Sequence, residues 1–342
     1  MKHISFTSAR NALTALALAA ALVPVWAADN ATPFIGHWAL TIPGGGAGWL
    51  GITKEQGYYD GGILWGGGSV LPVDSVFFPD DTMWVTRVNE VKRKDASGKV
   101  VRTQRFTEAI VAKVDGDTLS LTRFAPRENG LGVRTEEFTG KRIPPVPPTP
   151  DLANVKFGEP VVLFNGQDLA GWKLTSPGQV NGWSVKEGVL INRPEQEEGK
   201  PHKSYGNLRT EKVFEDFNLK LETRVPKGGN SGIYLRGIYE VQVADSFGKR
   251  LDSHNMGGIY SRITPTANAE KPFGEWQTFD ITLVDRHVTV VLNGTKIIDN
   301  QPLLGCTGGA LWSDVFRPGP LYLQGDHTGV DYRNIVLRPV NK

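Results

Sequence analysis

Residues 279–298 read FDITLVDRHVTVVLNGTKII, and this stretch predicts consecutive β-hairpins. Apolar and polar side chains alternate over residues 279–284, which is the period of a strand with one buried face. A second apolar run at 287–292 ends in Asn293-Gly294, one of the strongest signals for a tight hairpin turn. A third short strand is expected at 296–298. Strands joined by such short turns run antiparallel, so the stretch predicts an antiparallel sheet.

The rest of the chain also favours an all-β fold. Residues 219–225 and 333–338 alternate in the same way, and no segment has the pattern of a long helix. The 342 residues include 40 Gly, 22 Pro and 9 Trp, a composition typical of strands joined by tight turns. Many short strands separated by turn signals predict a β-sandwich in the second half of the chain.

A proline-rich stretch divides the chain. Residues 143–150 contain five prolines in eight positions, which favours a stiff extended spacer. We therefore predict an N-terminal β domain at 28–143, a linker at 144–156 and a second domain at 157–342.

The N-terminal domain has strand patterns at 83–88, 109–114 and 118–123, which predict a smaller antiparallel barrel or meander. Its opening Gly36-His37-Trp38 is similar to the Gly-x-Trp start of lipocalin-type barrels. Its aromatic residues fit a sugar platform or, more often for such residues, an apolar core; they are Trp49, Tyr58, Tyr59, Trp65 and Trp84.

Residues 1–27 have the pattern of a secretory signal peptide. Lys2 and Arg10 precede an apolar run at 12–25, and the small residue Ala27 follows it. This run is too short to span a bilayer comfortably, so we expect export to the periplasm or the extracellular space without stable membrane insertion after cleavage. The formal net charge of +2, without a long basic run, argues against nucleic acid as a partner.

The densest polar stretch lies between Asn230 and Asp245. On a strand at 238–244, Glu240 and Gln242 share one face, and Asp245 joins them only if the strand end turns its side chain. Arg236 and Gln242 are suited to bind sugar hydroxyl groups, and Glu240 is suited to act as an acid or base. The alternative is a solvated outer face, which is common for a sheet with one exposed side.

A second cluster contains Gln324, Asp326 and His327 at a predicted strand end. The imidazole of a histidine titrates near neutral pH, which makes His327 a candidate acid or base. We do not expect Asp326 to orient the ring of its own neighbour, and Glu240 or Asp245 is the better candidate partner. A third patch at 252–260 supplies His254 and Tyr260.

These patches also raise the hypothesis of a divalent metal held by His254, His327 and carboxylates. No HExxH or calcium-loop spacing accompanies it, and the chain has no GxSxG motif, P-loop or dinucleotide-binding fingerprint. The single cysteine, Cys306, excludes an intramolecular disulfide and is interpreted as a structural thiol.

Six motifs in the second half resemble, in order, those of the 3-keto-disaccharide hydrolase family. They are FNGQDLAGW at 164–172, WSVKEGVL at 183–190, GNSGI at 229–233, YEVQV at 239–243, GEWQ at 274–277 and QGDH at 324–327. The resemblance covers about residues 157–340. It implies a concanavalin A-like jelly-roll sandwich and activity on glycosides already oxidised to a ketone at C3 of the sugar.

The resemblance also implies a mechanism. One group removes the C2 proton, the glycosidic oxygen leaves by β-elimination, and water then adds to the resulting 2-hydroxy-glucal, so the net reaction is hydrolysis. The candidate catalytic residues are Glu240, His327 and Asp245, with the assignment of base and acid between Glu240 and His327 left open. The candidate substrate-binding residues are Arg236, Gln242, Asn230, Tyr260, Gln324 and Asp326.

Two other functions fit the same features. Residues 240–245 are similar in layout to the Glu-x-Asp-x-x-Glu strand of glucanases, but Gln242 replaces the middle acid, which argues against a glucanase acting on unoxidised glycan. A lectin-like carbohydrate-binding module without catalysis is the other alternative, because a fold does not fix a function. The combination of an acid with a titrating histidine favours the enzyme.

Overall fold

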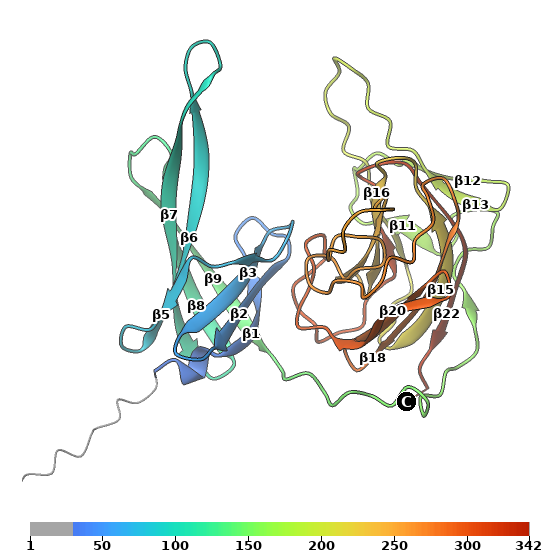
Figure 1. Cartoon of the computed structure of the whole chain (residues 1–342), viewed down its shortest axis with the longest axis horizontal. Coiled ribbons are helices and arrows are strands. Elements are labelled where there is room, and N and C mark those ends of the chain that lie inside the picture. Colours follow the sequence, from blue (N-terminus) through green and yellow to red (C-terminus); the bar gives the residue numbers. More distant parts are fainter. Residues whose placement is uncertain (1–29, 342) are drawn as a thin grey trace, which may run out of the picture.

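The computed structural model describes residues 30–341, and their regular structure is almost entirely β (Figure 1). One short 3-10 turn, η1 (Thr32–Phe34), is the exception within this range. The all-β prediction is therefore confirmed. The predicted signal peptide at 1–27 lies outside the described residues. Between residues 30 and 341 no helix is long and apolar enough to cross a membrane.

The N-terminal region forms one curled antiparallel sheet of nine strands, in the order β4-β3-β2-β1-β9-β8-β7-β6-β5. The patterns at 83–88, 109–114 and 118–123 lie within β6, β7 and β8, and β6 and β7 continue into a long hairpin that projects from the sheet (Figure 1). The strands are β1 (Gly36–Thr41), β2 (Gly48–Lys54), β3 (Tyr59–Trp65), β4 (Leu71–Pro72), β5 (Ser75–Phe77), β6 (Thr82–Lys94), β7 (Val100–Asp115), β8 (Thr118–Pro126) and β9 (Val133–Ile143).

The C-terminal region is a sandwich of two antiparallel sheets. One sheet has the order β12-β13-β22-β15-β18-β19-β20, with β10 also paired to β22, and the other has the order β11-β14-β21-β16-β17. The first contains β10 (Val161–Val162), β12 (Trp183–Lys186), β13 (Val189–Asn192), β15 (Phe217–Arg224), β18 (Gln277–Val284), β19 (His287–Leu292), β20 (Thr295–Pro302) and β22 (Val330–Pro339). The second contains β11 (Trp172–Leu174), β14 (Leu208–Thr210), β16 (Asn230–Leu235), β17 (Tyr239–Ala244) and β21 (Tyr322–Leu323).

Alternating apolar residues of the two sheets form one shared core. Leu219 and Ile281 come from the first sheet, and Ile233 and Val241 come from the second; all four are fully buried in the same cluster. The pattern of one buried face per strand thus produces two facing sheets. The predicted jelly-roll sandwich behind a smaller antiparallel β domain is confirmed.

The hairpins predicted at 279–298 form, with the expected turn at Asn293-Gly294. Asp285-Arg286 joins β18 to β19, Asn293-Gly294 joins β19 to β20, and all four residues have positive φ. Two consecutive residues with positive φ match the twist of the flanking strands, which explains the Asn-Gly signal.

The N-terminal sheet packs against the sandwich through Trp49 of β2. This side chain belongs to the apolar cluster of the sandwich, and its indole donates a hydrogen bond to the carbonyl of Leu304 (3.0 Å). The guanidinium of Arg262 lies 4.4 Å from the centre of its ring. A Cβ at Gly305 would lie 2.2 Å from the same indole. Trp49 is therefore a core residue at the contact between the two regions.

Candidate active site

The hairpin β16–β17 positions the carboxylate at the centre of the site. Glu240 pairs directly with Tyr234 across this hairpin, and Gln242 pairs with Gly232. Because side chains alternate along a strand, Glu240 and Gln242 point away from the core that holds Val241. Gly232 makes room for the acid, since a Cβ there would lie 2.5 Å from Oε1 of Glu240.

Glu240 is almost completely buried, with 3% of its surface exposed. Burial raises the pKa of its carboxyl group to about 7, because a charged carboxylate is poorly stabilised away from water. The hydroxyl of Tyr234 donates a hydrogen bond to Oε2 (2.6 Å), which opposes this rise. Glu240 therefore exchanges its proton near neutral pH, where a general base is most effective.

The side chain of Gln242, an amide and not an acid, contacts the carboxylate of Glu240. With its amide nitrogen turned toward the carboxylate, Gln242 donates to Oε1 of Glu240 (3.2 Å) and to the carbonyl of Ser231 (3.0 Å). This orientation satisfies both ends of the amide, whereas the opposite one leaves only a long contact to Asn230 (3.4 Å). Gln242 is buried, and its role here is to hold the carboxylate.

His327 and Asp326 form a hydrogen-bonded pair. Nδ1 of His327 lies 2.7 Å from Oδ1 of Asp326. The expectation that Asp326 would not orient its neighbour's ring is therefore wrong. Both residues lie in the loop after β21, where the chain no longer alternates and adjacent side chains can meet. The hydrogen bond to Asp326 raises the pKa of His327, which favours its protonated form.

Glu240, Asp326 and His327 line one pocket of about 230 Å³. Six of the predicted site residues line it: Asn230, Glu240, Tyr260, Gln324, Asp326 and His327. The side chain of Gln324 is buried, and its Oε1 accepts no hydrogen bond from residues 30–341. Gln324 therefore has an unpaired acceptor at the wall of the pocket.

Four predicted residues lie outside this lining, and one of them is Gln242, whose contact with Glu240 is described above. Arg236 is buried at the hairpin turn, where it donates to the carbonyls of Val315 (2.9 Å) and Arg317 (2.5 Å). Asp245 follows the end of β17 and accepts a hydrogen bond from the backbone of Gly228 (2.8 Å). His254 contacts Asp252 and lies 2.9 Å from the hydroxyl of Ser69.

The metal hypothesis has no matching ligand set in the described part of the chain. No three His, Cys, Asp or Glu side chains of residues 30–341 come together so as to hold a metal ion. His254 and His327, the two proposed ligands, have separate carboxylate partners, Asp252 and Asp326.

Sequence reasoning missed several residues of the pocket. Tyr234 and Tyr322 stack face to face with ring centres 4.1 Å apart, and Asn207 donates to the hydroxyl of Tyr322 (3.1 Å). Burial, followed by the nearby charge of Glu240, raises the pKa of Tyr234, which keeps its hydroxyl protonated as a donor. Tyr234 stands six residues before Glu240, and the antiparallel pairing of β16 with β17 brings the two residues opposite each other.

Glycines also belong to the pocket. Gly308 and Gly309 line it, and so does Gly68, which comes from the N-terminal sheet. A Cβ at Gly309 would lie 2.1 Å from the hydroxyl of Tyr234. These contacts join segments far apart in the sequence, and no local pattern indicates them.

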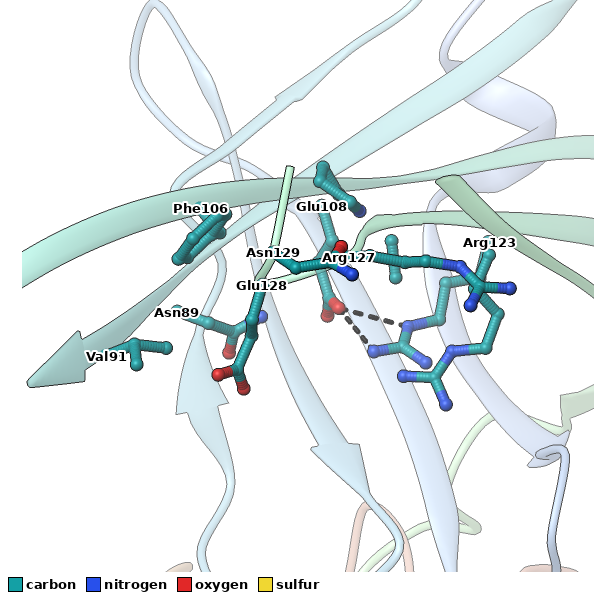
Figure 2. A pocket seen from close by; sticks show the side chains of 11 residues that line it. Asn89, Val91, Phe106, Glu108, Arg123, Arg127, Glu128 and Asn129 are labelled. Carbon is teal, nitrogen blue, oxygen red and sulfur yellow. Dashed lines mark hydrogen bonds and ion pairs between the residues drawn. The ribbon is translucent and has the colours of Figure 1, made fainter. Parts of the chain in front are cut away.

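A larger cavity, about 680 Å³, lies against β6, β7 and β8 in the N-terminal sheet (Figure 2). Its buried acid is Glu108, which is held by ion pairs with Arg123 and Arg87. Arg127 and Glu128 lie at the same cavity in Figure 2. Because ion pairs already compensate the charge of Glu108, its carboxylate is not available as an acid or base, and we place the candidate active site at Glu240.

Known proteins similar to this chain match its C-terminal sandwich. A curated 3-keto-disaccharide hydrolase from Bacteroides thetaiotaomicron is 25% identical over 171 residues, which are 41% of this chain and 57% of that protein. The chain thus spans just over half the length of this relative. Among solved structures, two candidate glycosyl hydrolases from Parabacteroides distasonis are similar. One is 31% identical with a TM-score of 0.44, covering 58% of this chain and 94% of the other. The second is 23% identical with a TM-score of 0.43, covering 53% and 94%.

The family model described as the 3-keto-alpha-glucoside-1,2-lyase-like domain matches residues 159–338. This match contains β10 to β21 and most of β22, and with them every strand of the candidate site. Since it covers more than half of the 342 residues, the chain belongs to the family of 3-keto-alpha-glucoside-1,2-lyase-like domains.

Proposed function

We propose that this protein is a glycoside-cleaving enzyme that acts on sugars oxidised to a ketone at C3. The observation that carries the proposal is the buried Glu240, whose pKa is raised to about 7, in a small pocket shared with His327. A group poised in this way is suited to remove a weakly acidic proton, such as the C2 proton beside a C3 ketone.

The first step of the proposed reaction is proton abstraction by the Glu240 carboxylate. The C2–H electrons form an enolate with the C3 ketone. The enolate then restores the ketone as C1=C2 forms and the bond from C1 to the glycosidic oxygen breaks. The protonated His327 gives its proton to this leaving oxygen, so the products are a free alcohol and a 3-keto-2-hydroxy-glucal.

The second step adds water to this alkene. Water gives one proton to the now neutral His327 as its oxygen bonds to C1, and the protonated Glu240 returns a proton to C2, so both side chains regain their starting states. The net products are the alcohol and a 3-keto-sugar, so the overall reaction is hydrolysis. In this scheme Tyr234 and Gln242 orient the carboxylate, and Gln324 binds a sugar hydroxyl group.

The arrangement supports this scheme better than hydrolysis of unoxidised glycan. Ordinary glycoside hydrolysis uses two carboxyl groups on opposite sides of the bond. Here the side chains bonded to Glu240 are the amide of Gln242 and the phenol of Tyr234, and the second carboxylate of the pocket, Asp326, is bonded to His327 (2.7 Å). A non-catalytic lectin has no use for a buried acid that titrates near neutral pH. Export to the periplasm or extracellular space belongs to the same proposal.

The test uses purified protein with a 3-keto-glucoside and its unoxidised parent, followed by mass spectrometry in H₂O and D₂O. We expect cleavage of the keto sugar alone, with deuterium from D₂O incorporated at C2. Cleavage of the parent glucoside would favour the glucanase, and binding without turnover of either sugar would favour the lectin. Parallel reactions with EDTA, with and without metal added back, report whether a divalent metal takes part.

A further inference from the structure

The N-terminal sheet contributes a wall to the candidate active site. Residues 66–69, here called the glycine loop, connect β3 to β4 and read Gly-Gly-Gly-Ser. Gly68 lines the same pocket as Glu240 and His327. The pocket is therefore not built by the sandwich alone, although every other residue of its lining comes from the sandwich.

The glycine loop lies directly on a glycine segment of the sandwich. A Cβ at Gly308 would lie 2.1 Å from the carbonyl oxygen of Gly68, and a Cβ at Gly67 would lie 3.5 Å from the carbonyl of Gly308. Such an approach requires a residue without a side chain at 308. Behind the loop, a Cβ at Gly46 would lie 3.1 Å from the carbonyl of Gly66, so the next turn of the N-terminal sheet supports it.

A chain of hydrogen bonds fixes the loop in this position. Oγ of Ser69 lies 2.9 Å from Nε2 of His254, and Nδ1 of His254 is bonded to Asp252. The ring of His254 meets Tyr260 edge-on, with ring centres 4.7 Å apart, and Tyr260 lines the pocket. One residue further on, the backbone of Val70 donates to the hydroxyl of Ser261 (2.8 Å).

We propose that the glycine loop closes one side of the sugar pocket and restricts the enzyme to a 3-keto-sugar at the end of a glycan. This inference rests on the proposed function. A pocket of about 230 Å³ is smaller than the roughly 300–1,000 Å³ of typical small-molecule sites and is suited to a single sugar ring. Ser69, His254 and Asp252 are positioning residues, because they act by holding the loop.

The test compares two substrates: a 3-keto-disaccharide whose oxidised ring is terminal, and the same compound with one more glucose attached to that ring. Ser69→Ala and His254→Ala each remove one link of the hydrogen-bond chain. His202→Ala is the matched control, because His202 is exposed and lies outside the pocket lining. kcat and KM are measured for each protein on both substrates.

We expect the unmodified protein and His202→Ala to prefer the terminal substrate by about tenfold or more in kcat/KM. In Ser69→Ala and His254→Ala this preference should fall roughly fivefold, mainly through KM, because one hydrogen bond that holds the wall is lost. Ser69→Thr, which keeps a hydroxyl group, should retain the preference. Amide exchange at residues 66–70 should be faster in the two alanine variants, which shows that the loop was released.

The outcomes separate the two proposals. An unmodified protein that cleaves neither keto sugar overturns the proposed function. One that cleaves both keto sugars equally well overturns the role of the loop and leaves the function intact. The role of the loop is also overturned if exchange at 66–70 increases while the preference stays unchanged. Loss of turnover by about a thousandfold in Ser69→Ala on both substrates would overturn it too, because that result indicates a nucleophilic serine.

Discussion

The two regions of the molecule each bury a glutamate against a cavity, and the two glutamates have different surroundings. Glu108 in the N-terminal sheet is 2% exposed, and Glu240 in the sandwich is 3% exposed. The carboxylate of Glu108 accepts hydrogen bonds from the guanidinium of Arg123 and lies 3.0 Å from Nη1 of Arg87. Glu240 forms no ion pair with a described lysine or arginine, and its strongest partner is the neutral phenol of Tyr234.

This difference in charge compensation, and not the size of the cavity, is the reason we place the candidate active site at Glu240. The larger cavity holds the compensated acid, and the smaller pocket holds the acid whose proton is exchangeable near neutral pH. A buried carboxylate between two guanidinium groups is a structural element, whereas one held by a phenol and an amide can accept a proton.

The strongest test of the comparison is Glu240→Gln. This variant keeps the size of the side chain but cannot accept the C2 proton, so kcat/KM on a 3-keto-glucoside should fall by about a thousandfold. Its stability at about pH 8 should not decrease. The pKa of Glu240 is raised in the folded protein, so the contribution of its carboxyl group to the free energy of unfolding is lost as pH rises from 4.5 to about 7. At about pH 8 the variant therefore has no such contribution to lose. Retention of activity within about tenfold would remove Glu240 from the mechanism.

Glu108→Gln should have the opposite effect: it should lower the stability of the protein and leave its activity nearly unchanged. It removes the ion-pair partner of Arg87 and leaves Arg123 with Glu136 alone, so the free energy of unfolding should fall by about 3 kcal/mol, measured by urea titration. Turnover per folded molecule should stay within about twofold of the unmodified protein, because Glu108 is not part of the candidate site. A large loss of kcat without loss of stability would contradict this contrast.

A third variant tests the space around the carboxylate of Glu240. In Gly232→Ala the new Cβ would lie 2.5 Å from Oε1 of Glu240, which displaces the carboxylate, so kcat should fall by about ten- to a hundredfold. Gly329→Ala is the matched control, because the nearest atom to its new Cβ is 3.4 Å away and Gly329 does not line the pocket. Equal kinetics for the two variants would show that the position of Glu240 does not matter.

The smallest effect is expected in the pH profile of Tyr234→Phe. Ionised Glu240 is the base, so kcat/KM should decline as pH falls through about 7. The hydrogen bond from Tyr234 lowers this pKa, and its removal should move the decline to higher pH by about one unit. Tyr205→Phe, whose hydroxyl donates to the carbonyl of Glu195 away from the pocket, should leave the profile unchanged. A decline that moves to lower pH would contradict the assignment.

Alternation along strands predicted much of this structure. Period two was sufficient to place Glu240 and Gln242 on one face, and the Asn293-Gly294 turn was sufficient to predict a hairpin with β19 and β20. These features depend on residues close together in the chain. Of the six predicted residues that line the pocket, Asn230 and Glu240 lie on strands placed in this way, and the other four lie outside the named strands.

Alternation along a strand no longer predicts the direction of a side chain at the point where the strand ends. Arg236 lies after the last residue of β16 with a φ of 54°, and its side chain is directed to backbone carbonyls of the 315–317 loop. Asp245 lies just beyond β17 and caps a turn instead of continuing the polar face. Gly68 reaches the pocket although it is far from Glu240 in the sequence, and only tertiary packing determines such a contact.

The direct pairing of Tyr234 with Glu240 has a consequence for how the protein avoids misfolding. A slip of β17 by one residue would turn Glu240 into the apolar core, where a carboxylate lacks any partner, so this error is strongly disfavoured. A slip by two residues would instead bring Gln242 opposite Tyr234 and produce a well-folded but inactive hairpin. In the native alignment the space left by the missing side chain of Gly232 is filled by the carboxylate of Glu240, a contact that is lost when Gln242 lies opposite Tyr234.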